Sequence, residues 1–277
     1  MPLYTCSLNS GSNGNCYYIG TASDAILVDA GLSCKETEKR MNENGLSMKR
    51  VRAVFISHEH TDHIRGIERI ATKYNIPVFI SDSTLKNSRL NIQPTLINGF
   101  KEGEKVTVAG INILPFRKFH DAADPHSFVV CHQGISIGIF TDIGRVCKKL
   151  MSHFQNCHAA FLETNYDEKM LEGGPYPHHL KKRIGGGNGH LSNLQALQLF
   201  LHYRNKQLSY LFLSHLSNEN NNPELVERLF NQYAFNTKIV VASRFCATPV
   251  YEISPGLMKK KDSGIIPLRR GTQLNLF

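Results

Sequence analysis

The sequence predicts an α/β protein in which helices pack on layers of β-strands. Short apolar runs rich in β-branched residues, such as residues 51–56, recur along the chain and are typical of buried strands. Stretches with helix-capping signals and a regularly spaced apolar face alternate with these runs. Several strand-like runs end on a polar or ionisable side chain, and such ends meet on one rim of a layered α/β fold. We therefore expect a functional site along one edge of the molecule.

The N-terminal residues predict short strands around a turn. Residues 9–15 are small, polar and rich in glycine, as in a loop that either shapes the mouth of a site or is only a turn. Strand-like runs at residues 17–19 and 25–28 follow, and Asp29 stands at the end of the second run. A carboxylate in that place could orient a metal-binding histidine, or it could be an ordinary turn residue. A capping box at residues 33–36 then opens a helix.

The next segment is the strongest chemical signal in the chain. Residues 57–63 read Ser-His-Glu-His-Thr-Asp-His and lie between a strand-like run and a helix-like run. In an extended loop His58 and His60 point the same way, whereas Asp62 and His63, at the helix start, can aim at a second point. One loop could therefore hold two metal ions. A charged surface turn is the alternative, but these side chains packed so closely would be poorly solvated without a metal.

The remaining elements continue the alternation of strands and helices. Capping signals predict a helix from residue 192 and another from Pro223. The further strand-like runs are residues 76–80, 105–108, 111–114, 127–131, 135–140, 159–163, 208–213, 238–242 and 249–253. Residues 167–190, which hold glycine-rich and basic runs, are expected to form an excursion from this framework.

Composition narrows the class of protein. At 277 residues with 41% hydrophobic side chains, the chain can bury a full core as an ordinary globular protein. No apolar run approaches the ~18 residues of a membrane span, and no secretory signal is visible. Seven cysteines without a Cys-X-X-Cys pair favour a reducing compartment, so we expect a cytoplasmic protein. The formal net charge of +9 favours a polyanionic partner, with nucleic acid as the first candidate.

The histidine-rich run and the polar residues at later strand ends together resemble the metallo-β-lactamase superfamily. The resemblance implies a four-layer αββα sandwich with metals at one edge of two facing sheets. It also implies ligands for a first metal (His58, His60 and His120), ligands for a second metal (Asp62, His63 and His215), and a bridging carboxylate (Asp142). Neutral imidazoles and carboxylates suit zinc, manganese or iron. Two such ions ~3.5–4 Å apart can activate a shared water.

Several further stretches are similar to the YycJ/WalJ group of bacterial nucleases within that superfamily. They are residues 10–16, 120–125, 163–167, 189–193, 215–217 and 219–221. The group implies 5′→3′ DNA exonuclease activity in DNA repair or replication. Superfamily ribonucleases with an inserted nucleic-acid domain need roughly 100 further residues, for which the interval 142–215 has no room.

The expected chemistry is hydrolysis of a phosphodiester, with hydroxide activated by two metals attacking phosphorus. Asp62 and His190 are the expected catalytic residues. His190 precedes a helix N-terminus, so it could donate a proton or contact a phosphate, or it could be a capping or core histidine. Lys181, Lys182 and Arg183 could grip the DNA backbone or form an ordinary solvated charge run.

We expect a hydrolase domain at residues 1–253 and a basic tail at residues 254–277. The tail ends in Gln273, Leu274, Asn275, Leu276 and Phe277, which is similar to the short peptide with which bacterial replication and repair proteins bind the sliding clamp. Leucine and phenylalanine on an extended tail can fill an apolar pocket while glutamine supplies a polar anchor. A last strand packed on the domain is the alternative for this segment.

Two other functions remain alternatives at this stage. A small-molecule hydrolase acting on a thioester, a lactone or a cyclic nucleotide could use the same dinuclear site, but it would leave the basic segment and the clamp-like tail unexplained. A non-catalytic DNA-binding scaffold would leave the set of metal-binding side chains unexplained.

Overall fold

The structure is a computed structural model that describes residues 1–254, and within them the chain forms two seven-stranded mixed sheets. The first sheet contains, in spatial order, β14 (Tyr251–Ile253), β1 (Leu3–Asn9), β2 (Cys16–Gly20), β3 (Ala25–Val28), β4 (Val51–Phe55), β5 (Val78–Phe79) and β6 (Ile97–Asn98). The second contains β13 (Lys238–Val241), β12 (Tyr210–Ser214), β11 (Ala159–Glu163), β10 (Ile135–Phe140), β9 (His126–His132), β8 (Ile111–Arg117) and β7 (Val106–Val108).

The two sheets face each other across an aromatic core. Phe55 on β4 packs against Phe128 on β9 with ring centroids 5.8 Å apart, and Tyr17 on β2 lies 4.9 Å from Phe161 on β11. Side chains alternate between the two faces of a strand, so Val54 points to the opposite face of the first sheet, where helices cover it. Both faces of the strand are buried after the exposed Arg52, which explains the apolar run at residues 53–56.

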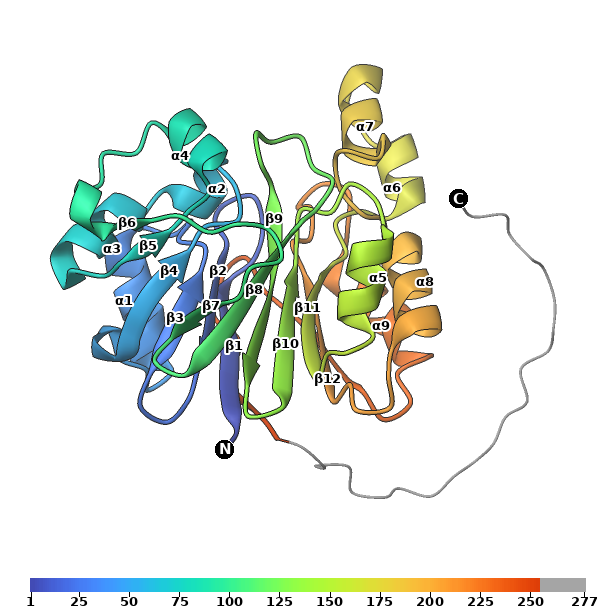
Figure 1. The fold of residues 1–277 in the computed structure, drawn as a ribbon. Helices are drawn as coiled ribbons and strands as arrows, with labels where there is room; N and C mark the ends of the chain where they lie inside the picture. The colour runs from blue at the N-terminus through green and yellow to red at the C-terminus, as the bar shows by residue number, and fades with distance from the viewer. Residues whose placement is uncertain (255–277) are drawn as a thin grey trace.

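Helices cover the outer face of each sheet (Figure 1). On the first sheet these are α1 (Cys34–Glu43), α2 (Thr61–Ile64), α3 (Ile67–Tyr74) and α4 (Asp82–Ser88). On the second sheet they are α5 (Lys148–Phe154), α8 (Asn193–Tyr203) and α9 (Pro223–Asn231). Their buried side chains form a separate core with each sheet, for example Phe200 of α8 and Phe230 of α9 with Leu213 of β12. The expected four-layer αββα sandwich is therefore confirmed.

One local expectation gains detail and two need correction. The excursion at residues 167–190 contains two helices, α6 (Glu168–Gly173) and α7 (His178–Gly185), and α7 stands away from the body of the protein (Figure 1). The single helix expected after the histidine-rich run is broken into α2 and α3 at Gly66, where a Cβ atom would lie 2.0 Å from the carbonyl oxygen of Leu32. The strand expected at residues 76–80 pairs over only two residues.

Parallel pairing decides where the polar ends of the strands lie. Strands β3 to β6 run parallel in the first sheet and β10 to β13 run parallel in the second. Their carboxyl ends therefore meet at one edge of the sandwich. Within residues 1–254 no helix has the length and apolar character needed to cross a bilayer.

Candidate metal centre

Loops at this common edge bring together the side chains that the histidine-rich run and the later strand ends supply. His58 and His60 lie on the loop after β4, and Asp62 and His63 lie in the first turn of α2. From the second sheet, His120 follows β8, Asp142 follows β10 and His215 follows β12. These residues span much of the chain, and the two sheets deliver them to one place.

Three polar residues at this edge have positive backbone φ angles. Asp29, Asp142 and His215 each follow a strand and have φ values of 61°, 54° and 58°. The left-handed region is sparsely populated by residues other than glycine, and such positions cluster at functional sites. Here the conformation turns each side chain toward the edge directly after its strand ends.

One group of donors consists of His58, His60 and His120. The donor atoms of these side chains lie within 4.8 Å of one another, and the rings of His58 and His120 have centroids 4.9 Å apart. His120 Nδ1 donates a hydrogen bond to the carbonyl oxygen of Gly189 at 2.9 Å, which leaves Nε2 free to bind a metal. This group is the one expected for a first metal.

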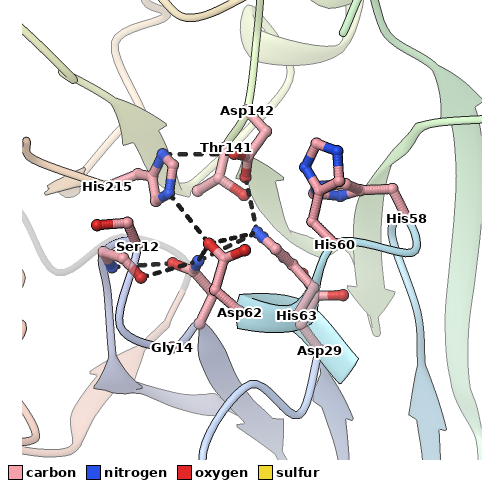
Figure 2. Close-up of polar contacts among 12 residues, drawn as sticks. Ser12, Gly14, Asp29, His58, His60, Asp62, His63, Thr141, Asp142 and His215 are labelled. Atoms are coloured by element: carbon pink, nitrogen blue, oxygen red, sulfur yellow. Dashed lines mark hydrogen bonds and ion pairs between the residues drawn. The ribbon is translucent and has the colours of Figure 1, made fainter. Parts of the chain in front are cut away.

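A second group consists of Asp62, His63 and His215. Asp62 Oδ2 lies 3.4 Å from His63 Nε2 and 3.7 Å from His215 Nε2. Asp142 lies beside both groups, with Oδ2 at 3.2 Å from His63 Nε2. Figure 2 shows Asp142 and His63 between the pair His58 and His60 on one side and His215 on the other. Asp142 also forms one candidate donor group with His58 and His63 and another with Glu163, His190 and His215.

Buried carboxylates behind the site hold these imidazoles in place. His63 Nδ1 donates to Asp29 Oδ2 at 2.7 Å, and Asp29 Oδ1 accepts the backbone N–H of Ser57 at 2.8 Å. Asp29 therefore contacts a histidine of the donor groups from behind, as its position at the end of a strand suggested.

Glu163 is a second buried carboxylate that holds imidazoles in place, on the other side of the site. It was not among the site residues expected from the sequence. Its Oε1 accepts hydrogen bonds from His190 Nδ1 at 2.8 Å and His215 Nδ1 at 2.9 Å. Its Oε2 accepts the backbone N–H groups of Ile143 at 2.6 Å and Leu191 at 3.1 Å. A signal was present, because Glu163 stands at the end of a strand-like run as Asp29 does.

Asn15, in the glycine-rich loop, is a second residue whose contact was not foreseen. It is fully buried, and its Nδ2 donates to Asp62 Oδ2 at 3.1 Å. The loop therefore reaches the donors directly.

The electrostatics reflect strong burial of opposite charges. Burial holds the pKa of His58 well below its usual value and lowers that of His120 to about 4. Burial alone would lower the pKa of His215, but Asp142, Asp62 and Glu163 raise it to about 10. The carboxylates thus attract positive charge strongly, and a divalent cation binding here would displace protons from histidine.

The donor atoms fit a divalent metal ion. Ten buried side-chain atoms within residues 1–254 have no hydrogen-bond partner, and His120 Nε2, His215 Nε2 and Asp142 Oδ2 are three of them. Buried polar atoms are rarely left unpaired, and all three belong to the donor groups above. Imidazole nitrogens and carboxylate oxygens are the ligands that first-row divalent metals take. The site is therefore suited to binding divalent metal.

The other expected site residues lie next to the donor groups, on α7, or outside the described residues. His190 is half-buried at the rim, with its ring centroid 5.3 Å from that of His120. Lys181, Lys182 and Arg183 lie on α7, which has no buried residue; Arg183 Nε donates to Asp121 Oδ2 at 2.6 Å and Lys181 Nζ to the carbonyl oxygen of Glu172 at 2.6 Å. The peptide at residues 273–277 lies outside the described residues.

Comparison with known proteins agrees with this geometry. The model of the "Beta-lactamase superfamily domain" matches residues 24–213. Exodeoxyribonuclease YycJ of Bacillus anthracis is 33% identical over 84% of this chain and 89% of its own length. Exodeoxyribonuclease WalJ of Streptococcus pneumoniae is 32% identical over 89% of this chain and 96% of its own.

Solved structures share the fold at lower sequence identity. The metallo-β-lactamase fold protein YhfI from Bacillus subtilis has a TM-score of 0.70 at 15% identity, covering 91% of this chain and 99% of its own. Zn²⁺-bound PqqB from Methylobacterium extorquens has a TM-score of 0.67 at 13% identity, covering 88% and 99%. With the αββα sandwich and the donor groups at its edge, these matches show that the chain belongs to the metallo-β-lactamase superfamily of hydrolases and, within it, to the group that contains YycJ and WalJ.

Proposed function

We propose that the protein is a metal-dependent exodeoxyribonuclease that degrades DNA in the 5′→3′ direction, in repair or replication. The observation that supports this most is the pair of donor groups sharing Asp142 at the sandwich edge, in a chain similar over most of its length to two exodeoxyribonucleases. The formal net charge of +9 agrees with a polyanionic substrate.

In this proposal the chain holds two divalent metal ions, zinc or manganese, with iron also compatible with the donors. His58, His60 and His120 would hold one ion and Asp62, His63 and His215 the other, and Asp142, which lies beside both groups, would supply a carboxylate between them. When bound, two such ions lower the pKa of water and neutralise charge on the phosphoryl oxygens.

The residues around the donors orient the reacting groups. Asp62, held by Asn15, orients the attacking water. His190 Nδ1 donates to Glu163, so Nε2 can face the substrate. When the ring carries a proton on both nitrogens, Nε2 either gives its proton to the leaving alkoxide or donates a hydrogen bond to a phosphate oxygen. The glycine-rich loop at residues 10–15 forms part of the mouth of this site.

The basic face of α7 is proposed to contact the DNA backbone through Lys181, Lys182 and Arg183. The helix stands at the same edge as the donors, and Arg183 is tied to Asp121, the residue after His120 (Figure 1). Replacing Lys182 by alanine should weaken binding equally for all sequences and reduce the slope of log K against log salt by about 1. An unchanged salt dependence would identify an ordinary solvated charge run.

The activity can be tested with the purified full chain. Duplex DNA, single-stranded DNA and RNA, labelled at either end, are incubated with Mn²⁺ or Zn²⁺, and the Asp62→Ala/His63→Ala double variant is the control. We expect metal-dependent release of nucleotides from the 5′ end of DNA and none with the double variant. If no nucleic acid is cleaved, the proposal fails, and hydrolysis of thioesters, lactones or cyclic nucleotides would support a small-molecule enzyme.

We further propose that residues 1–253 form the catalytic domain of a cytoplasmic enzyme and that the tail at residues 254–277 attaches it to the sliding clamp through Gln273, Leu274, Leu276 and Phe277. Deleting residues 273–277 should abolish clamp binding, measured by surface plasmon resonance, and leave hydrolysis of short oligonucleotides intact. Loss of both activities, or retained clamp binding, would refute this role.

A further inference from the structure

A cavity of about 220 Å³ opens beside the proposed metal centre. One wall is the chain that leaves β12, with Leu216 and Ser217, and the other is the chain that leaves β13, with Arg244 and Phe245. Ser10 of the glycine-rich loop completes the lining. Neither the metal donors nor the basic helix uses this cavity.

The cavity shares its framework with the donors. The backbone N–H of His215 donates to Ser10 Oγ at 2.8 Å, and Leu216 and Ser217 follow His215 directly. Strands β12 and β13 pair in parallel, with Leu213 opposite Val241, so both exit at the same edge. A group in the cavity is therefore adjacent to whatever His215 binds.

The lining has the chemistry of a surface on which nucleobases stack. Phe245 is 76% exposed, which is unusual for an aromatic side chain, and the Arg244 guanidinium lies 6.0 Å from its ring centroid. Within residues 1–254, Arg244 Nη1 is buried without a hydrogen-bond partner. Aromatic and guanidinium planes together hold the unpaired bases of single strands, with little dependence on base identity.

The backbone of this loop is fixed before any ligand binds. Ser10 N donates to the carbonyl oxygen of Ser243 at 3.1 Å, and Asn13 Nδ2 donates to that of Arg244 at 2.8 Å. The buried Arg40 donates through Nη2 to the carbonyl oxygen of Phe245 at 3.0 Å. Phe245 is therefore presented to solvent on a rigid support, so stacking on it requires little ordering of the chain.

We infer that this cavity receives one unpaired nucleobase of the strand whose phosphate lies at the metal centre, stacked on Phe245. The inference rests on the proposed nuclease function and adds a binding site for the base to it. The volume lies below the ~300–1,000 Å³ of pockets for drug-sized ligands, so it suits a single base and excludes a base pair. The cavity would thus select a single-stranded end.

The chain contains a matched control for this site. Phe235 is 74% exposed and lies over Arg204 with the guanidinium 3.9 Å from its ring centroid, so it resembles Phe245 in exposure and partner. It precedes β13 whereas Phe245 follows it, so the two aromatic residues lie at opposite ends of that strand.

The test compares Phe245→Ala, Phe245→Trp and Phe235→Ala on single-stranded oligonucleotides that carry one abasic residue at successive positions from the 5′ end. We expect Phe245→Ala to lower kcat/KM about tenfold, mainly through KM, while Phe245→Trp and Phe235→Ala stay near the unaltered protein. At one position of the oligonucleotide, the abasic residue should lower kcat/KM of the unaltered protein about as much as Phe245→Ala does. In Phe245→Ala, the abasic residue at that position should cause no further loss. The inference would be overturned if the abasic residue and Phe245→Ala lowered kcat/KM additively, or if Phe245→Ala caused no loss of kcat/KM.

A measurement of DNA affinity tests the base site independently of the proposed nuclease activity. Fluorescence anisotropy with a labelled oligonucleotide and a chelator measures affinity without cleavage. We expect Phe245→Ala to weaken binding about tenfold and the abasic residue to remove that difference, even if no cleavage is ever observed. Cleavage by the unaltered protein combined with equal binding of all three variants would refute the base site alone.

Discussion

Replacing Glu163 by glutamine should separate metal binding from folding. The side chain is 0% exposed and accepts four hydrogen bonds, two from imidazoles and two from backbone N–H groups. In Glu163→Gln the amide oxygen can still accept both backbone bonds, so we expect the fold to remain. The amide NH₂ then faces His190 and His215, each of which must change tautomer to accept a hydrogen bond through Nδ1.

The change of tautomer sets the size of the effect. It moves the proton of His215 onto Nε2, the atom that lies 3.7 Å from Asp62 and belongs to the second donor group. A protonated nitrogen cannot bind a metal. Loss of such a supporting carboxylate typically weakens metal binding about 10- to 100-fold, which corresponds to about 1.4–2.8 kcal/mol. By contrast, Glu163→Ala leaves several buried donors unpaired at about 1–3 kcal/mol each, so it would confuse folding with binding.

The assay is a competition titration of Zn²⁺ or Mn²⁺ against a chromophoric chelator, with circular dichroism to verify the fold. The matched control is Glu102→Gln, which removes a partly exposed carboxylate that accepts the backbone N–H of Arg117 at 3.1 Å. Metal affinity of Glu163→Gln equal to that of the control, with native circular dichroism, would show that Glu163 does not position His215.

Three other substitutions test the framework of the site. Asp29→Asn removes the acceptor of His63 Nδ1 and should weaken metal binding about 10- to 100-fold in the same titration. Gly31→Ala places a Cβ atom 1.7 Å from the carbonyl oxygen of Asp62, so it should lower the free energy of unfolding in urea by about 1–3 kcal/mol or more and also weaken metal binding. Phe161→Ala opens a cavity between the sheets and should cost about 3–5 kcal/mol in the urea titration.

The substitutions of Asp29 and Gly31 each have a matched control substitution elsewhere in the chain. Asp24→Asn alters a carboxylate paired with Arg52 near the surface, and Gly99→Ala adds a methyl group that meets nothing within 4 Å. If Asp29→Asn binds metal as tightly as Asp24→Asn, Asp29 does not orient a ligand. Gly31→Ala with the stability of Gly99→Ala would contradict the close approach, and a loss below about 1 kcal/mol in Phe161→Ala would contradict the packing between the sheets.

Much of the fold was predictable because its elements have strong local signals. Residues 51–56 predicted a strand, and β4 occupies most of that run. Residues 192–195 predicted a helix start, and α8 begins there with both hydrogen bonds of the capping box. The helix α7 was missed because it buries no residue and so lacks the apolar periodicity that identifies a helix.

The break at Gly66 was missed for a different reason. The apolar spacing over residues 64–74 suits one face of a helix, and the only local signal against it is Gly66, a residue that helices tolerate at a cost of about 1 kcal/mol. The backbone of Leu32 approaches Gly66 at the break, and this contact between distant residues could not be read from the sequence of residues 64–74.

The sequence by itself determined which side chains the protein has for metal chemistry and that the residues of the histidine-rich run stand together on one loop. Only the tertiary structure decided that Glu163 lies behind His190 and His215, that Asn15 reaches Asp62, and that a cavity opens beside His215. Local propensity acts over a few residues, whereas these contacts depend on which strands pair in parallel and on how two sheets pack face to face. Those choices are made by hydrogen-bond register and burial between segments that are far apart in the chain.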